Sequence, residues 1–282
     1  LVSAQPTAVG QVLGNRWRID ARIGKGAMAE VYRALDLQTA AYVALKILRN
    51  SVAGDPAIKQ RFAREAEVQA RVRHHNVAHL LATGVTQTDQ PYLVVELLRG
   101  KTLRGVIKEE GRVGVRRASS YAWQMLQGLS AVHGAGILHR DLKPANIMLE
   151  PSPGPVERVV LIDFGFASVE GSAKLTQQGT VVGSLRYIAP ERLRGEPVDA
   201  RSDLYSVGVM LYELLMGTPP FAQVDDFELV DAHLTHDPPP VDDAVPPALD
   251  RVMRVALAKQ QADRYPDAAT MAAAIEAAAK SS

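Results

Sequence analysis

Cysteine is missing from the sequence of 282 residues. This absence excludes disulfides, thiolate metal sites and cysteine nucleophiles, and it suits a reducing compartment. Long apolar runs are missing as well: none approaches the roughly 20 residues that a membrane-spanning helix needs, and no charged-then-apolar segment opens the chain. We therefore expect no membrane segment within this chain and a cytoplasmic location, while a longer parent protein could still be membrane-anchored.

An excess of charge of one sign is also missing. With 32 Lys and Arg against 31 Asp and Glu, the formal net charge is +1, and the two signs are interleaved along the chain. Nucleic-acid-binding proteins usually show a strong basic excess or a basic stripe, so we expect no nucleic-acid partner. The content of 47% hydrophobic and 22% charged residues is that of an ordinary globular protein, and the length allows two small cores.

The first third of the chain has the pattern of β-strands, after a leader or linker of mixed, small residues at 1–16. One helix interrupts the strands, because Asp55 is a suitable N-cap, Pro56 follows at the first helical position, and Phe62 and Glu65 lie on one helical stripe. The segments that alternate or run apolar as strands are 17–20, 30–34, 42–47 and 92–95.

Beyond Gly100 the pattern changes to helices, predicted over 115–134, 203–216 and 268–280. The segment 203–216 is apolar on nearly every side, so it should run through the middle of the second half of the chain and end at Gly217. A strand-rich part followed by a helical part is compatible with two lobes.

The segment from Gly24 to Val31 joins two strand patterns and contains Gly24 and Gly26. A glycine-rich loop of this kind can bring backbone N–H groups close to phosphate oxygens, because no Cβ intervenes. A hairpin can also contain two glycines for structural reasons alone, and Ala29 stands at the third glycine position of the G-x-G-x-x-G pattern. A dinucleotide-binding fold would need a helix directly after the loop, whereas Val31 begins a strand. Alone, the loop is weak support for a phosphate site.

Lys46 lies inside an apolar strand, where an unpaired ammonium group would be costly to bury. Glu65 lies on the same helical stripe as Ile58 and Phe62, so the helix turns this carboxylate toward the core. The two charges on inward faces predict an ion pair, and the alternative is that each side chain reaches water separately.

The strongest pattern is HRDLKPAN over 139–146, followed after a strand and a turn by VVLIDFG over 159–165. It places Asp141, Asn146 and Asp163 at the ends of apolar strands. Carboxylate and amide oxygens there suit binding of Mg²⁺ and orientation of a hydroxyl group. As a purely structural loop, this cluster would crowd charges beside buried strands for no gain.

Together these motifs resemble the protein kinase superfamily, in particular the bacterial eukaryotic-like (Hanks-type) serine/threonine protein kinases, over about residues 17–280. The resemblance implies an α+β, two-lobed fold. Its N-lobe, over 17–95, would be a small antiparallel sheet with one main helix. A hinge over 96–100 would lead to a larger, mainly helical C-lobe over 101–282.

The resemblance implies transfer of the γ-phosphoryl group of ATP, with Mg²⁺ or alternatively Mn²⁺, to a protein Ser or Thr hydroxyl. In this reading Asp141 receives or orients the hydroxyl, Lys143 reaches the transferred phosphate, and Lys46, held by Glu65, holds the α- and β-phosphates. The implied metal ligands are Asn146 and Asp163. The implied nucleotide-contacting positions are Ile23, Gly24, Lys25, Gly26, Val31, Ala44, Lys46, Val95, Glu96, Leu98 and Met148.

The same resemblance implies activation by autophosphorylation between Asp163 and Glu191, with Thr180 the favoured site and Thr176 next. Segment 171–186 contains no Asp or Glu, so a phosphothreonine there would give the Arg140 guanidinium an anion to bind. The implied structural positions are Arg140, Glu191, Asp203, which opens the central helix, and Arg264, which pairs with Glu191. The implied partners are proteins with Ser or Thr hydroxyls and the chain itself, and a dimer is compatible with the sequence.

One departure from the family pattern is Gln69, which puts a polar group where an apolar residue is common, so we expect the helix around it to be less firmly docked. Two alternatives share the fold. A pseudokinase scaffold usually lacks the equivalents of Lys46, Asp141 or Asp163, and all three are present. A small-molecule kinase of the aminoglycoside phosphotransferase type typically lacks the glycine loop and the segment Ala189-Pro190-Glu191, and both are present.

Overall fold

The computed structural model describes residues 9–163, 185–223 and 225–280, and it divides the chain into two compact units. The sheet unit comprises Leu1–His74 and Ala78–Arg99, and the helical unit comprises His75–Val77 and Gly100–Ser282. The change from strands to helices near residue 100 therefore coincides with the change of unit. The short segment His75–Val77 departs from the predicted division, because it belongs to the helical unit although strands of the sheet unit precede and follow it.

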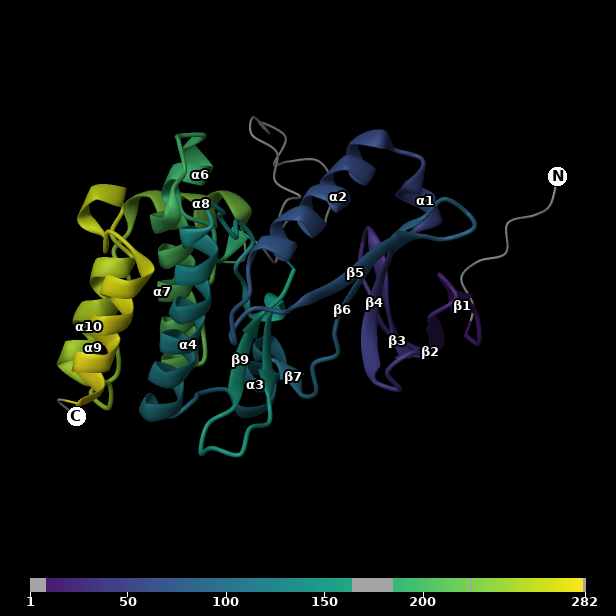
Figure 1. Cartoon of the computed structure of the whole chain (residues 1–282). Coiled ribbons are helices and arrows are strands. Elements are labelled where there is room, and N and C mark those ends of the chain that lie inside the picture. Colours follow the sequence, from purple (N-terminus) through teal and green to yellow (C-terminus); the bar gives the residue numbers. More distant parts are fainter. Residues whose placement is uncertain (1–8, 164–184, 224, 281–282) are drawn as a thin grey trace. The chain divides into compact units, whose positions relative to one another are not determined.

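The sheet unit is built on an antiparallel sheet with the strand order β1-β2-β3-β4-β6-β5 (Figure 1). The prediction of a leader over 1–16 needs correction, because Leu13 pairs with Trp17 and is buried, and Arg16 donates hydrogen bonds to both carboxylate oxygens of Asp36 at 2.7 and 2.8 Å. The strands are β1 (Val12–Leu13), β2 (Trp17–Lys25), β3 (Ala29–Asp36), β4 (Tyr42–Leu48), β5 (Leu80–Val85) and β6 (Pro91–Glu96).

Each face of this sheet has its own apolar cluster. One face carries Trp17, Leu45 and Val94 among its buried residues. The opposite face carries Leu48 and Leu93, which pack with residues of helices α1 (Asn50–Ala53) and α2 (Pro56–Arg71). The predicted cap is confirmed, since the Asp55 side chain accepts a hydrogen bond from the N–H of Ala57 at the start of α2.

Gln69 does not loosen α2 in the way we expected. Its side chain is buried, and Nε2 donates a hydrogen bond of 2.9 Å to the carbonyl oxygen of Ala78, just before β5. A buried amide with such a partner is satisfied, and removing the partner would leave a costly unpaired polar group. The polar side chain therefore ties the last turn of α2 to the chain that leads into the sheet.

The helical unit is arranged around α7, which packs against α4 and α9, while α10 packs against α4 and α9 (Figure 1). Almost all of α7 is buried, as its apolar pattern predicts. Among the described residues, no helix combines the length and the apolar character needed to cross a membrane. The elements are β7 (Lys101–Thr102), α3 (Leu103–Glu110), α4 (Val115–Gly134), η1 (Pro144–Asn146), β8 (Ile147–Glu150), β9 (Arg158–Leu161), α6 (Pro190–Arg194), α7 (Ala200–Met216), α8 (Asp226–Thr235), α9 (Pro247–Ala256), η2 (Gln261–Asp263) and α10 (Ala268–Lys280).

The start of α7 corrects one prediction. Asp203 does not open the helix but lies in its first turn, because the helix begins at Ala200, after the N-cap Asp199 whose side chain accepts from the N–H of Arg201. The end agrees with the sequence, since Gly217 has the left-handed conformation that commonly ends a helix.

The segment His75–Val77 is tied to the helical unit through Asn76. Its Nδ2 donates to the carbonyl oxygen of Val159 at 2.7 Å and to Gln124 Oε1 at 3.1 Å, and its own carbonyl accepts from the N–H of Leu161. Gly128 of α4 permits this close approach, because a Cβ there would lie 2.8 Å from the Asn76 carbonyl oxygen.

Candidate active site

Several of the expected nucleotide-binding residues of the sheet unit share one face of the sheet. Gly24 is paired with Val31, Val31 with Lys46, and Ala44 with Val95 across neighbouring strands. Directly opposed residues of a sheet project to the same side, and Ala44 and Lys46 are two apart on β4. These five positions therefore line the face that also carries α2.

The turn between β2 and β3 is tight. The N–H of Gly26 donates to the carbonyl of Ala29 at 2.8 Å, and a Cβ on Gly26 would lie 3.2 Å from that oxygen. The carbonyl oxygens of Ala27 and Met28 are both held by Arg49, through its side chain at 3.1 Å and its backbone N–H at 2.8 Å. Arg49, which the sequence did not single out, thus fixes the tip of the glycine loop.

The predicted ion pair of the sheet unit is present. Lys46 Nζ lies 2.5 Å from Glu65 Oε1, and the two side chains are 19% and 13% exposed. The strand supplies the ammonium group and α2 supplies the carboxylate. Both side chains are thus shielded from bulk water without being sealed from it.

Three of the expected nucleotide-contacting residues, Val95, Glu96 and Leu98, lie at or just after the end of β6. The N–H of Glu96 donates to the carbonyl of His79 at 3.0 Å, and the N–H of His79 donates to Glu96 Oε1 at 3.0 Å. Val95 and Leu98 are half-buried, whereas Ile23, at a shift in the pairing of β2, is 52% exposed. The backbone at Glu96 is therefore held by reciprocal hydrogen bonds within the sheet unit.

In the helical unit, the loop before β8 brings three polar side chains together. Asp141 Oδ2 accepts a hydrogen bond from Lys143 Nζ at 2.7 Å and from Asn146 Nδ2 at 3.0 Å. Asn146 Nδ2 also lies 2.8 Å from the backbone carbonyl oxygen of Asp141, and the Asn146 side chain is buried. The Asp141 carboxylate is thus held from two sides by donors of its own loop.

Asn146 and Asp163 stand at the same end of the β8–β9 hairpin. Ile147 is paired with Leu161, and the N–H of Ile162 donates to the carbonyl of Asn146 at 3.0 Å. Asp163 follows directly, exposed and with a φ of 53°. The pairing of the two strands therefore places Asn146 and Asp163, which are 17 positions apart in the sequence, at the same end of the hairpin.

The donors at this end of the hairpin fit a magnesium ion better than a transition metal. Oxygen ligands from one amide and one or two carboxylates are typical of Mg²⁺, which usually completes its shell with phosphate and water. Across the described residues, no group of three or more His, Cys, Asp or Glu side chains could hold a metal. Asn146 and Asp163 are the residues at this end that would supply oxygen ligands to such an ion, with phosphate and water completing its shell.

Asp203, in the first turn of α7, accepts hydrogen bonds from the backbone of the loop that contains Asp141. Oδ2 accepts from the N–H of His139 at 2.9 Å and Oδ1 from the N–H of Arg140 at 3.0 Å. Burial by itself raises the pKa of Asp203, but the hydrogen bond with His133 and the neighbouring donors lower it below its ordinary value. The carboxylate therefore stays charged.

His133, which contacts Asp203 through Nε2 at 2.9 Å, was missed by the sequence analysis. Its only signal in the sequence is a polar residue near the end of an amphipathic helix. His139, the first residue of the motif over 139–146, is fully buried, and burial lowers its pKa.

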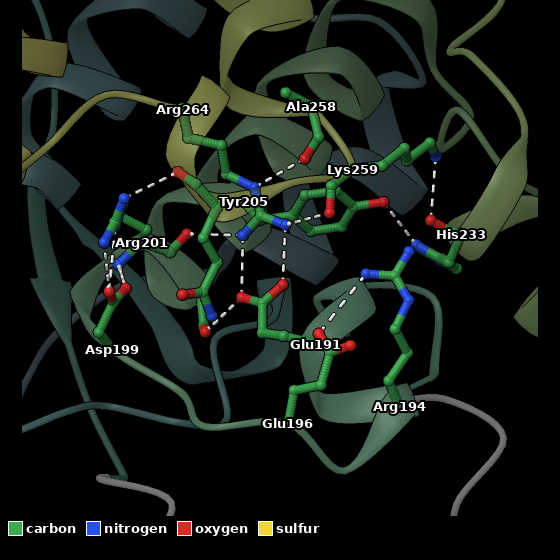
Figure 2. Close-up of polar contacts among 12 residues, drawn as sticks. Glu191, Arg194, Glu196, Asp199, Arg201, Tyr205, His233, Ala258, Lys259 and Arg264 are labelled. Carbon is green, nitrogen blue, oxygen red and sulfur yellow. Dashed lines mark hydrogen bonds and ion pairs between the residues drawn. The ribbon is translucent and has the colours of Figure 1, made fainter.

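The predicted pair of Glu191 and Arg264 is confirmed (Figure 2). Arg264 Nη1 and Nη2 donate to the two carboxylate oxygens at 2.9 and 2.8 Å, and the hydroxyl of Ser202 donates to Oε1 at 2.5 Å. Burial by itself raises the pKa of Glu191, but the hydrogen bonds from Arg264 and Ser202 lower it below its ordinary value. This clamp, formed by Glu191, Arg264 and Ser202, fixes α6, the helix that follows the segment 164–184.

The remaining expected site residues differ in what the structure says of them. Met148 is half-buried on β8, opposite Val160. Lys25 is exposed at the end of β2. Thr176 and Thr180 lie outside the described residues, so their proposed modification stays a prediction.

Comparisons with known proteins agree on one family. The family model "protein kinase domain" matches residues 17–274. The chain is 39% identical over 274 residues to a probable serine/threonine-protein kinase PknB of Corynebacterium glutamicum, covering 93% of this chain and 42% of that protein. It is 37% identical over 281 residues to the serine/threonine-protein kinase pkn3 of Myxococcus xanthus, covering 96% and 51%.

Solved structures give the same result for the fold. A crystal structure of a mutant PknI kinase domain from Mycobacterium tuberculosis matches with a TM-score of 0.73 and 26% identity, over 98% of this chain and 100% of that chain. A double mutant of the same domain matches with a TM-score of 0.74 and 27% identity, over 97% and 100%. The chain thus matches a whole kinase domain, while it spans about half or less of the length of the two curated relatives.

Proposed function

Because the chain belongs to the protein kinase domain family, we propose that it transfers the γ-phosphoryl group of Mg-ATP to Ser and Thr hydroxyls of proteins. The observation that carries the proposal is the arrangement around Asp141, whose carboxylate is held by Lys143 and Asn146. Phosphoryl transfer depends mostly on positioning and on neutralising charge, and a preorganised carboxylate beside a lysine supplies both.

The sheet unit would bind the nucleotide through the face that carries Val31, Ala44 and Lys46. The Lys46 ammonium group, already oriented by Glu65, would hold the α- and β-phosphates. Since the N–H of Glu96 donates to His79, a main-chain contact from Glu96 to adenine would come from its carbonyl, and the complementary donor would be the N–H of Leu98.

The helical unit would supply the transfer chemistry. Asn146 and Asp163 would hold Mg²⁺, which neutralises phosphate charge when bound. Asp141 would accept a hydrogen bond from the substrate hydroxyl and orient it toward the phosphate. Lys143 would balance the charge on the transferred phosphoryl group, and its position two residues after Asp141 supports the Ser/Thr class, as do the names of the relatives.

The regulation and setting of the whole protein are part of this proposal. We propose autophosphorylation at Thr180 or Thr176, with Arg140 binding the phosphate, because a phosphothreonine adds about −1.5 to −2 charges and three acceptor oxygens. Because the reaction needs ATP, we place the domain in the cytoplasm. A dimer would allow one copy to phosphorylate the other.

The test is intact-mass analysis of the purified chain and of Asp141→Asn after incubation with Mg-ATP and a basic acceptor protein. We expect added phosphate on Ser or Thr, with peptide mapping assigning it to Thr180 or Thr176. Asp141→Asn should transfer at least about 10²-fold more slowly while still binding ATP. ATP binding without transfer by the unchanged chain would indicate a pseudokinase, and transfer only to a small molecule would contradict protein kinase activity.

A further inference from the structure

The backbone directly before Asp141 has an unusual conformation. Arg140 has a φ of 65°, in the left-handed region that residues other than glycine rarely occupy. Such a strained conformation persists only where surrounding contacts fix it. The contacts that fix the backbone of Arg140 therefore also fix the position of the next residue, Asp141.

The peptide between Arg140 and Asp141 is held at both of its polar groups. The N–H of Asp141 donates to the carbonyl of His139 at 2.9 Å. The carbonyl oxygen of Arg140 accepts a hydrogen bond from Nη1 of Arg192. The N–H groups of His139 and Arg140, just before this peptide, donate to the carboxylate of Asp203. The backbone around Asp141 is therefore held by several hydrogen bonds.

Arg192 reaches the loop from α6, a helix that cannot easily shift. The residue before it, Glu191, is bonded to Arg264 (Figure 2) and accepts a hydrogen bond from the hydroxyl of Ser202. Glu191 thus fixes helix α6, and the next residue, Arg192, extends to the loop that contains Asp141. Because Glu191 and Arg192 are neighbours in the sequence, the bonds that hold Glu191 also limit the movement of Arg192.

The electrostatic surroundings of Arg192 agree with a role at this loop. Burial lowers the pKa of its guanidinium group, whereas the charges of Asp203 and Asp141 raise it and that of Arg140 lowers it. Arg194, two residues later on the same helix, is more exposed; it lies 3.6 Å from Glu196 and donates to the carbonyl oxygen of Leu234 at 3.4 Å. Among the described residues, the part-buried guanidinium group of Arg192 thus lies close to the charges of this loop and donates to its backbone.

We propose that Arg192 is a positioning residue, which fixes the peptide between Arg140 and Asp141 and thereby orients the Asp141 carboxylate for transfer. The inference rests on the proposed function of Asp141. Arg192 itself touches neither nucleotide nor substrate in this proposal. Small displacements of a catalytic group can cost about 10²-fold in rate, so one hydrogen bond to the backbone beside Asp141 is enough to matter.

The test compares Arg192→Met, Arg192→Lys and the matched control Arg194→Met in the full chain. The first variant removes charge and donors, the second keeps the charge and a donor, and the control removes an exposed arginine of the same helix. Four quantities are measured for each: kcat and KM for ATP with a peptide acceptor, the fraction folded, and the exchange rate of the Asp141 amide hydrogen.

We expect Arg192→Met to lower kcat by about 10- to 100-fold with KM for ATP changed less than about twofold. Arg192→Lys should recover a large part of kcat, and Arg194→Met should match the unchanged chain. The Asp141 amide should exchange faster only in Arg192→Met, a result that does not depend on activity.

Unchanged kcat in Arg192→Met would overturn the inference. So would equal losses in ATP binding and kcat, or unfolding of both Arg192 variants, because Arg192 would then serve stability alone. A chain that shows no transfer before any substitution would instead contradict the proposed function, and the amide exchange would still test the contact.

Discussion

The Lys46–Glu65 pair of the sheet unit and the Arg264–Glu191 pair of the helical unit join a cation and a carboxylate in different surroundings. The first pair is part-exposed, with side chains 19% and 13% accessible. The second is sealed, with Arg264 at 0% and Glu191 at 2%. Arg264 also donates through Nε to the carbonyl of Ala258 at 2.7 Å, so its planar group is bonded along several edges.

The Arg264–Glu191 pair is sealed from water, as suits a structural role, whereas the Lys46–Glu65 pair is partly exposed, as suits a place beside a ligand. A sealed pair is tolerable only when its polar atoms have partners, and then its loss is costly because one charge stays buried alone. Lys46 is partly exposed and lies on the face that we propose binds the nucleotide. We therefore expect stability to depend more on Arg264 and activity more on Lys46.

The largest effect on stability is expected for Arg264→Met. It leaves the Glu191 carboxylate buried without its cation, which should lower the free energy of unfolding by about 3–5 kcal/mol, measured by urea denaturation. The control Arg254→Met breaks the surface pair with Asp250 and should cost less than about 0.5 kcal/mol. The double variant Arg264→Met with Glu191→Leu should recover much of the loss. Equal costs for Arg264→Met and Arg254→Met would show that the sealed pair is not a clamp.

For Lys46→Met we expect a smaller loss of stability together with loss of phosphate transfer. Because the pair is part-exposed, the free energy of unfolding should fall by about 1–3 kcal/mol, between the values for surface and buried pairs. Lys46→Met with Glu65→Leu should recover stability and still fail to transfer phosphate, as denaturation and a transfer assay would show. Additive losses of stability in this cycle would mean that the two side chains do not depend on each other.

Much of this organisation was predictable because its signals are local. The ion pair of Lys46 and Glu65 follows from two charges on inward faces, and the cap at Asp55 follows from the residue types at the helix start. The cluster around Asp141 lies within one loop of eight residues. In each case the residues that matter are close in sequence or share a regular period, so their geometry is set by the element they belong to.

The rest depends on contacts between distant segments. Nothing in the sequence around Asn76 shows that its amide will bond to Val159, and Gln69 looked misplaced because its acceptor at Ala78 is a backbone carbonyl with no sequence signature. Arg192 carries no period and no motif of its own. Its partner is a backbone carbonyl 52 residues away in the sequence.

The smallest expected effect concerns pH and the sealed pair. Burial alone would raise the pKa of Glu191, but the hydrogen bonds from Arg264 and Ser202 lower it below the value of a free Glu, near 4.5. A carboxylate whose pKa is lower in the folded state stabilises the fold above the unfolded pKa, and this contribution is lost as the pH falls through the folded pKa. Urea denaturation at pH 7 and at several values below 5 should therefore show a steeper acid loss of stability for the unchanged chain than for Glu191→Gln, which has no proton to gain. Parallel curves for the two proteins would mean that Glu191 titrates alike in both states, and that the clamp contributes through shape and not through charge.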